Sequence, residues 1–258
     1  MFISTQDLEK IHKDDSVLIL DARSYKDYSK GHISGAVSLD LFSFHWADTS
    51  EKGLVSFGEH MRKILSYAGI DENKKIVFYD NSSGMLAARG VWLCLYFSHP
   101  DVQMLDGGLS KWTGENLPTE TESTIYKPSN LSTPIDPSII IGFEELNEKL
   151  GNVTIIDARS PDEFNGTIPR AARGGHLPTA KNIDWTNNLD DSGKLKSDNE
   201  LESLYQISKD APIVTYCQGA YRAANSYLSL KKIGFKNVRV YLGSWGEWGN
   251  DLNLPIEK

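Results

Sequence analysis

The sequence predicts an α/β protein of two homologous domains in tandem, each a mostly parallel sheet with helices on both faces. Short apolar runs rich in β-branched residues alternate with stretches of helical periodicity, which indicates strands joined by helices. The phrase Asp-Ala-Arg-Ser follows such a run at residues 21–24 and again at 157–160, an offset of 136 positions (157 − 21). Strands that alternate with helices form mostly parallel sheets covered on both sides.

Two further anchors keep the same register. Tyr79-Asp80 matches Tyr216-Cys217 at an offset of 137 (217 − 80), and the segment from Gly107 to Trp112 matches the segment from Gly243 to Trp248 at 136 (248 − 112). A constant offset over most of each half indicates an internal duplication.

The composition changes between the repeats. From Glu115 onward prolines lie among Thr and Ser, and periodicity is lost, which is typical of a semi-extended linker. We therefore expect an N-terminal domain over 1–118, a linker over 119–138 and a C-terminal domain over 139–258.

The first repeat should open with a helix, for which Ser4 is a suitable N-cap. A buried strand follows at 17–20, where four apolar residues are consecutive. Ser24 can cap a short helix that ends at residue 28, and Gly31 then turns the chain into a short strand.

Helical spacing returns over 57–67. The mostly apolar stretches 75–79 and 102–105 predict buried strands. The stretch 85–97 between them, which is apolar throughout 91–97, predicts a core helix, and its Cys94 is assigned to the core because free cysteine is usually buried and inert.

The second repeat should begin with a helix over 139–150 and a strand over 153–156. A strand over 213–216 then leads to a helix over 222–233, which Gly234 ends.

Composition limits the class of function. The chain has 258 residues, of which 40% are hydrophobic and 24% charged, as in ordinary globular proteins. Its net charge of −8 argues against nucleic acid and anionic membranes as partners. No apolar run approaches the roughly 18 residues of a membrane span, and the N-terminus lacks signal-peptide regions. The two cysteines suit a reducing compartment, so we expect a cytoplasmic protein. We also expect a monomer.

The chemistry is predicted at Cys217, which ends the strand over 213–216 just before a loop and a helix. Backbone N–H groups and the helix N-terminus should face the sulfur, and Arg222 should add a positive charge. These features favour a thiolate and would also hold an anionic substrate. The loop that contains both residues is therefore the predicted site of a nucleophile.

The loop spacing separates two thiol chemistries. Phosphatases place five residues between cysteine and arginine, whereas four separate Cys217 from Arg222. The smaller ring suits one extra sulfur atom better than a phosphoryl group, so a cysteine-dependent phosphatase or arsenate reductase is the weaker alternative.

In the first repeat Asp80 occupies the position of the cysteine. This predicts that the first domain is catalytically silent and forms one wall of the pocket.

The repeated Asp-Ala-Arg phrases, two Gly-His turns (31–33 and 175–177), the Cys-x4-Arg loop and the closing segment 243–248 resemble the two-domain rhodaneses, the thiosulfate and 3-mercaptopyruvate sulfurtransferases. The resemblance covers about residues 3–255. It implies two tandem rhodanese-like domains, of which only the second is catalytic. It also implies a covalent persulfide on Cys217 and no metal or organic cofactor.

In that reading sulfane sulfur moves from thiosulfate to Cys217 and then to cyanide or a thiol, with a thioredoxin-like reductant as one possible partner. The persulfide would lie within the N–H groups of the active-site loop, which comprises Gln218, Gly219, Ala220, Tyr221 and Arg222. A 3-mercaptopyruvate donor and a non-catalytic sulfur-carrier module are the alternatives.

Departures from the family pattern bear on the donor. Gly219 stands where animal thiosulfate enzymes carry a lysine, and Glu163 stands where the family uses an arginine on the donor. Arg170 and Arg173 are candidates to compensate by reaching the pocket. We favour thiosulfate because a dianion gains more than a carboxylate from the fixed charge of Arg222, and because neither residue 219 nor residue 221 is Ser or Thr.

The remaining motifs are assigned to structure. Asp21 and Arg23 recur as Asp157 and Arg159 although only one repeat has the cysteine. We therefore expect an ion pair that holds the strand end in each domain.

Overall fold

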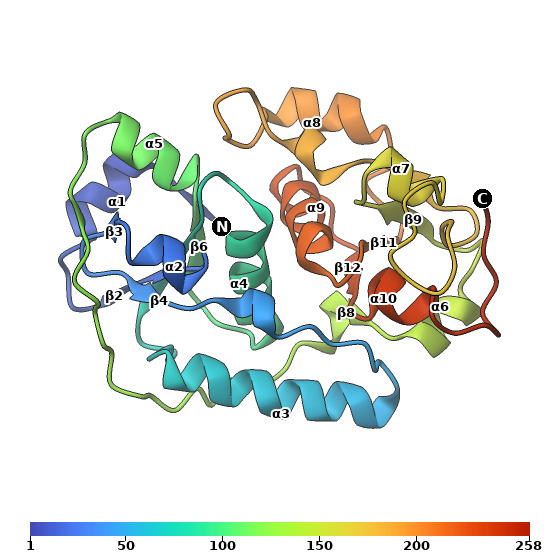
Figure 1. The fold of residues 1–258 in the computed structure, drawn as a ribbon, viewed down its shortest axis with the longest axis horizontal. Helices are drawn as coiled ribbons and strands as arrows, with labels where there is room; N and C mark the ends of the chain where they lie inside the picture. Colours follow the sequence, from blue (N-terminus) through green and yellow to red (C-terminus); the bar gives the residue numbers. More distant parts are fainter. The chain divides into compact units, whose positions relative to one another are not determined.

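The computed structural model describes residues 1–258, which divide into two compact units. Unit 1 contains Met1–Phe44, Gly58–Asp136 and Leu189–Leu195, and unit 2 contains His45–Phe57, Pro137–Asn188 and Lys196–Lys258. Each unit is a parallel five-stranded sheet with helices packed on it (Figure 1). The predicted α/β fold with two homologous domains is confirmed.

Unit 1 has the strand order β1-β6-β5-β2-β4, with every pair parallel. Its sheet strands are β1 (Phe2–Ile3), β2 (Val17–Asp21), β4 (Val37–Ser38), β5 (Lys75–Tyr79) and β6 (Val102–Leu105), and a small antiparallel pair joins β3 (His32–Ile33) to β7 (Thr119–Glu120). Its helices are α1 (Thr5–Ile11), α2 (Tyr25–Tyr28), η1 (Leu41–Ser43), α3 (Glu51–Tyr67, whose first turns belong to unit 2), α4 (Met85–Tyr96) and α5 (Gly108–Gly114).

Unit 2 has the order β10-β9-β11-β12-β8, again all parallel. Its strands are β8 (Ile140–Ile141), β9 (Thr154–Asp157), β10 (Lys181–Asn182), β11 (Ile213–Tyr216) and β12 (Val238–Tyr241). Its helices are η2 (Pro137–Ile139), α6 (Phe143–Glu148), α7 (Pro161–Phe164), η3 (Trp185–Asn188), α8 (Asp198–Tyr205), α9 (Tyr221–Lys232) and α10 (Ser244–Trp248).

Side-chain alternation along the strands sorts the helices into layers. In unit 1, Val77 and Tyr79 of β5 point into a core with α1 and α5, whereas Phe78 points to the other face and meets α4 at Gly90. In unit 2, Val214 and Tyr216 of β11 likewise share a core with α6 and α10. The opposite face carries α9, so each sheet is covered on both sides (Figure 1).

The duplication extends to individual hydrogen bonds. Arg23 and Arg159 each clamp the aspartate two residues earlier, with guanidinium–carboxylate contacts of 2.6 Å in both units. Trp112 donates its indole N–H to Pro118 O and Trp248 to Pro255 O. The expected ion pair at each strand end is therefore confirmed in both repeats.

The chain between the repeats packs on unit 1, and the helix expected after it is shorter than predicted. The stretch expected as a linker packs on unit 1 up to Asp136: Leu131 is buried, and Ser129 donates to Ser66 O. The expected helix over 139–150 is instead a short 3-10 turn, strand β8 and the shorter helix α6. The run Ile140–Ile141 pairs with β12 as a strand, because β-branched side chains favour extended backbone over a helix.

Candidate active site

Cys217 follows β11 directly, and β11 lies between β9 and β12 in the sheet of unit 2. The helix after the loop, α9, begins at Tyr221. In parallel α/β sheets, ligands bind outside the carboxyl ends of the strands. The sequence therefore located the candidate nucleophile correctly within the fold: it lies at the carboxyl end of a central strand and before a helix N-terminus.

The loop turns at Ala220, which adopts the left-handed conformation with φ 66° at the N-cap of α9. A non-glycine residue in this region stores strain of about 1–3 kcal/mol. Gly219 is required for a different reason: a Cβ there would lie 2.7 Å from the Cδ2 atom of His45. The glycine thus lets a histidine ring pack directly on the loop.

The hydroxyl group of Ser244 holds the loop in place by hydrogen bonds. Its hydroxyl accepts the N–H groups of Cys217 (3.2 Å) and Ala220 (3.1 Å) and donates to Tyr241 O (2.9 Å). Ser244 itself holds a left-handed φ of 53°, where its counterpart in unit 1 is Gly108. The hydroxyl replaces the hydrogen bonds that the strained turn would otherwise leave unmade. Sequence reasoning missed this residue, because a lone serine gives no signal.

Arg222, expected to close an anion cradle, forms a bidentate ion pair with Glu163. Its two Nη atoms lie 2.5 and 3.0 Å from the carboxylate oxygens, and both side chains are largely buried. Burial raises the pKa of Glu163, but Arg222 outweighs that effect and brings the pKa to about 2. Burial lowers the pKa of Arg222, whereas Glu163 and the Cys217 sulfur raise it, and the net shift is upward.

The low pKa of Glu163 predicts a pH-dependent contribution to stability. A carboxyl group with a lowered folded-state pKa stabilises the fold above its ordinary value of 4.5, and this contribution is lost as the pH falls toward about 2. We expect Glu163→Gln to lower the free energy of unfolding by up to about 3 kcal/mol at pH 7.

Urea unfolding of both proteins at pH 7, 4 and 3 measures this effect, and the difference between them should shrink at the lower pH. Glu202→Gln removes an exposed ion pair with Lys209 and is the matched control. A difference between wild type and Glu163→Gln that is constant from pH 7 to pH 3 contradicts the assignment.

The other two arginines have separate positions. Arg170 Nη1 lies 3.4 Å from Glu163, and its carbonyl accepts the side-chain amide of Gln218. Arg173 instead donates to the backbone carbonyls of residues 248, 251 and 254 in the C-terminal segment. Arg170 therefore contacts Glu163 and Gln218 next to the loop. Arg173 instead holds the C-terminal segment in place.

Residues 45–57, from the first repeat, belong to unit 2 and complete this site. The ring centroid of His45 lies 4.9 Å from that of Tyr221 in the loop. Thr49 donates its N–H (2.6 Å) and hydroxyl (2.5 Å) to the carboxylate of Glu247. Burial raises the pKa of Glu247, and the hydrogen bonds from Thr49 and Tyr241 oppose this shift. Sequence reasoning did not identify His45 or Thr49, since neither lies near Cys217 in the chain.

The corresponding loop of unit 1 is filled by its own side chain. The Asp80 carboxylate accepts the N–H groups of Ser82, Gly84, Leu86 and Ala87 at 3.0–3.1 Å. Burial raises the pKa of Asp80, and these N–H groups oppose that effect. The carboxylate occupies the ring of donors at the N-terminus of α4, where an anion would otherwise bind.

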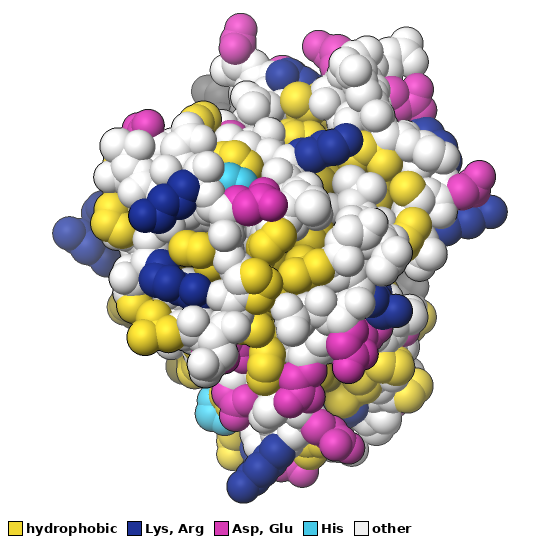
Figure 2. Space-filling model, turned by 90° about the vertical axis from the view of Figure 1, so that its right-hand side faces the viewer, with side chains coloured by type: hydrophobic (Ala, Val, Ile, Leu, Met, Phe, Trp, Pro, Cys, Tyr) yellow, Lys and Arg dark blue, Asp and Glu magenta, His cyan; other side chains and the backbone are white.

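Four further observations concern the second cysteine, metal binding, membrane crossing and surface charge. Cys94 is fully buried in α4, where burial raises the pKa of its thiol, so its assignment to the core is confirmed. No cluster of three or more His, Cys, Asp or Glu side chains is placed to hold a metal ion. No helix is both long and apolar enough to cross a membrane. On the face drawn in Figure 2, acidic and basic side chains are interspersed.

A duplicated parallel sheet with a cysteine loop in one copy defines an α/β protein of two homologous domains, one of which carries a candidate nucleophile. The rhodanese-like domain family matches residues 4–115 and 143–251. The chain therefore belongs to the rhodanese family and contains two rhodanese domains, as the sequence motifs predicted.

Named relatives cover nearly the whole chain. The sulfur carrier protein TtuD of Thermus thermophilus is 32% identical over 277 residues, covering 100% of this chain and 96% of the relative. A thiosulfate sulfurtransferase of Pseudomonas aeruginosa is 31% identical, covering 93% and 91%. The crystal structure of SseA from Escherichia coli, described as a 3-mercaptopyruvate sulfotransferase, superposes with a TM-score of 0.80 at 27% identity, covering 95% and 98%.

Proposed function

We propose that this protein is a sulfurtransferase that moves sulfane sulfur from thiosulfate to cyanide or a thiol through a persulfide on Cys217. The observation that carries the proposal is the position of Cys217 at the carboxyl end of β11, in a strained loop fastened by Ser244. Relatives named thiosulfate sulfurtransferase support the donor.

In the first half-reaction the Cys217 thiolate attacks the outer sulfur of thiosulfate. The new S–S bond forms as the bond between the two sulfurs of thiosulfate breaks, and sulfite leaves with the electron pair. The persulfide anion would then lie before the first turn of α9, where backbone N–H groups and the helix dipole favour negative charge.

In the second half-reaction the acceptor attacks the outer sulfur of the persulfide. With cyanide, a C–S bond forms, the S–S bond breaks, and thiocyanate leaves while Cys217 returns to the thiolate. Donor and acceptor thus react in separate steps, so this route is ping-pong. Sulfur travels on the cysteine itself, and the route needs no other carrier.

The Glu163–Arg222 pair changes the reason for choosing thiosulfate. Because Glu163 already neutralises Arg222, the loop offers a dianion less charge than an unpaired arginine would. The choice of donor then rests on the named relatives and on the lack of Ser or Thr at Gly219 and Tyr221. The pair also makes Glu163 the group that sets the charge offered to the donor.

A sulfur-carrier role is the second candidate, and the likeness to TtuD over the whole chain favours it. A carrier would accept sulfur on Cys217 but turn over slowly with every small acceptor. The likeness to SseA supports 3-mercaptopyruvate as the alternative donor in the same persulfide chemistry. Comparing kcat/KM for the two donors separates these alternatives.

We expect thiosulfate to add one sulfur atom to the protein, and cyanide to remove it. Intact mass spectrometry before and after each reagent measures this, with Cys217→Ser as the variant that should gain nothing and Cys94→Ser as the matched cysteine control. No mass gain in the wild type, or an equal gain in Cys217→Ser, would contradict the persulfide. A gain without thiocyanate turnover would favour the carrier.

A further inference from the structure

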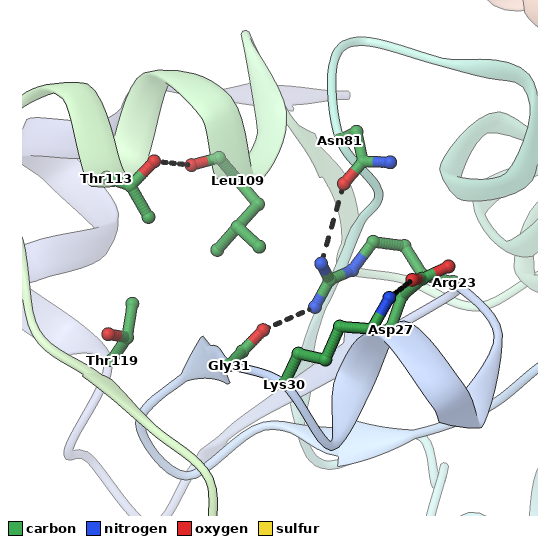
Figure 3. Close-up of a pocket in the computed structure, with 8 residues that line it drawn as sticks. All are labelled: Arg23, Asp27, Lys30, Gly31, Asn81, Leu109, Thr113 and Thr119. Atoms are coloured by element: carbon green, nitrogen blue, oxygen red, sulfur yellow. Dashed lines mark hydrogen bonds and ion pairs between the residues drawn. The ribbon is translucent and has the colours of Figure 1, made fainter.

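Unit 1 contains a cavity of about 400 Å³ next to its silent loop, at the carboxyl ends of β2 and β5. Figure 3 shows Leu109, Thr113 and Thr119 on one side of it, facing Arg23 and Asn81 on the other. Its volume falls within the roughly 300–1,000 Å³ typical of small-molecule sites. Cys217 is not among its lining residues, so the cavity is separate from the candidate active site.

Unit 2 shows what fills the same place in the other repeat. Arg23 and Arg159 correspond at an offset of 136 (159 − 23), but Gly31 and Gly175 correspond at 144 (175 − 31), so eight residues are inserted in the second repeat. The inserted segment contacts the residues of unit 2 that correspond to residues lining the cavity in unit 1. Arg170 O accepts the amide of Gln218, which corresponds to Asn81, and Arg173 N donates to the carbonyl of Gly249, which corresponds to Thr113. Unit 1 lacks this segment.

A second difference enlarges the cavity. In unit 2 the guanidinium of Arg159 lies 4.6 Å from the ring centroid of Trp245. The counterpart of Trp245 is Leu109, because Leu109 N donates to Asp80 O as Trp245 N does to Cys217 O. Unit 1 therefore keeps the buried arginine but lacks the indole that covers it.

The polar groups around the cavity suit an anion of modest affinity. Arg23 is only 6% exposed, and its Nη1 has a long 3.5 Å contact with Asn81 Oδ1, whereas its other nitrogens bind Asp21 and Gly31 O. Lys30 at the rim pairs with Asp27 at 2.8 Å and is exposed, so a ligand can share its charge. Thr113 Oγ1 donates to its own helix, so its hydroxyl is not a donor for an anion, which leaves Lys30 and the Asn81 amide as the groups that can bind one.

We propose that this cavity binds an aromatic carboxylate, with the ring against Leu109 and the Arg23 guanidinium and the carboxylate near Lys30 and Asn81. The ring would restore the cation–π contact that Trp245 makes in the other repeat. The carboxylate would gain a charge-assisted hydrogen bond at a partly desolvated site.

Indole-3-acetate is the probe and indole-3-acetamide its neutral control, titrated into the full chain by calorimetry. We expect indole-3-acetate to bind with a Kd below about 1 mM and the amide to bind at least about fivefold more weakly. Leu109→Trp, which supplies the missing indole, should weaken indole-3-acetate at least about tenfold. Lys30→Gln should weaken the acid but not the amide, and Cys217→Ser should leave binding unchanged.

Three results would overturn the proposal: no binding at about 10 mM probe, equal binding of acid and amide, or equal binding by wild type and Leu109→Trp. Circular dichroism and sulfur transfer at the wild-type rate show that the Leu109→Trp protein is folded. If it does not fold, the exposed Lys30→Gln variant decides the outcome alone, and equal binding of the acid by Lys30→Gln and wild type then overturns the proposal. The readout is binding, so it is independent of the proposed sulfur transfer.

Discussion

Residues 137–258, expressed without the preceding chain, should transfer sulfur at least about a hundredfold more slowly than the whole protein, since misplacing a catalytic loop by about 1 Å can cost that much. The fragment contains Cys217, Arg222 and Ser244 but lacks residues 45–57, which belong to unit 2. Those residues place His45 against Gly219 and Tyr221 of the loop.

The lost segment also leaves buried polar groups without partners. Thr49 supplies two donors to Glu247 and an acceptor for the N–H of Phe143, which opens α6. Unsatisfied buried groups cost about 1–3 kcal/mol each, so the fragment should also be less stable. Residues 1–118 alone should show no activity, because Asp80 stands at the cysteine position.

Steady-state rates and urea unfolding of the fragment and the full chain measure both effects. Thr49→Val in the full chain tests the same contacts in a protein that retains every segment, and it should lose activity and stability in the same direction. Thr113→Val is the matched control, since the Thr113 hydroxyl bonds only to carbonyls of its own helix. A fragment as active as the whole chain would show that residues 45–57 do not support the loop.

Arg222→Ala should lower kcat/KM for thiosulfate by about 2–4 kcal/mol of transition-state binding. The variant removes the positive charge beside the Cys217 sulfur and leaves Glu163 as an unpaired, buried carboxylate next to the loop. Both consequences disfavour an anionic donor and a persulfide. Stability should fall as well, because Glu163 loses its buried partner. The kinetics are therefore measured under conditions in which circular dichroism shows that the variant is folded.

Glu163→Gln should have the opposite effect on thiosulfate, raising kcat/KM severalfold because the amide can still hold Arg222 while the charge of Arg222 is released to the donor. The double variant should be less impaired than Arg222→Ala alone, since it lacks the orphaned carboxylate. Thiosulfate kinetics that are unchanged in Arg222→Ala would remove the arginine from the donor site. A double variant no better than Arg222→Ala would show that Glu163 acts only by holding the fold.

The local sequence pattern was sufficient to predict much of the fold of this protein. Hydrophobic runs and N-cap residues predicted most central strands and helices, and the constant offset between repeats predicted two copies of one sheet. Cys217 was found because strand, cysteine, loop and helix are contiguous in the chain. Asp157 and Arg159 were assigned to structure because the silent repeat carries the same pair, and the structure confirms that pair.

The partners of the loop were decided by the tertiary structure, because they come from distant segments with no local signal. Glu163 lies 59 positions from Arg222, and the sequence showed only that it replaces an arginine, not that it neutralises one. His45, Thr49 and Ser244 are ordinary residues until the fold brings them to the loop or its support. The sequence by itself determined the fold class, the duplication and the position of the candidate nucleophile, which depend on contiguous residues. The charge at the loop and the cavity of unit 1 depend on packing between segments, and only the folded chain decides them.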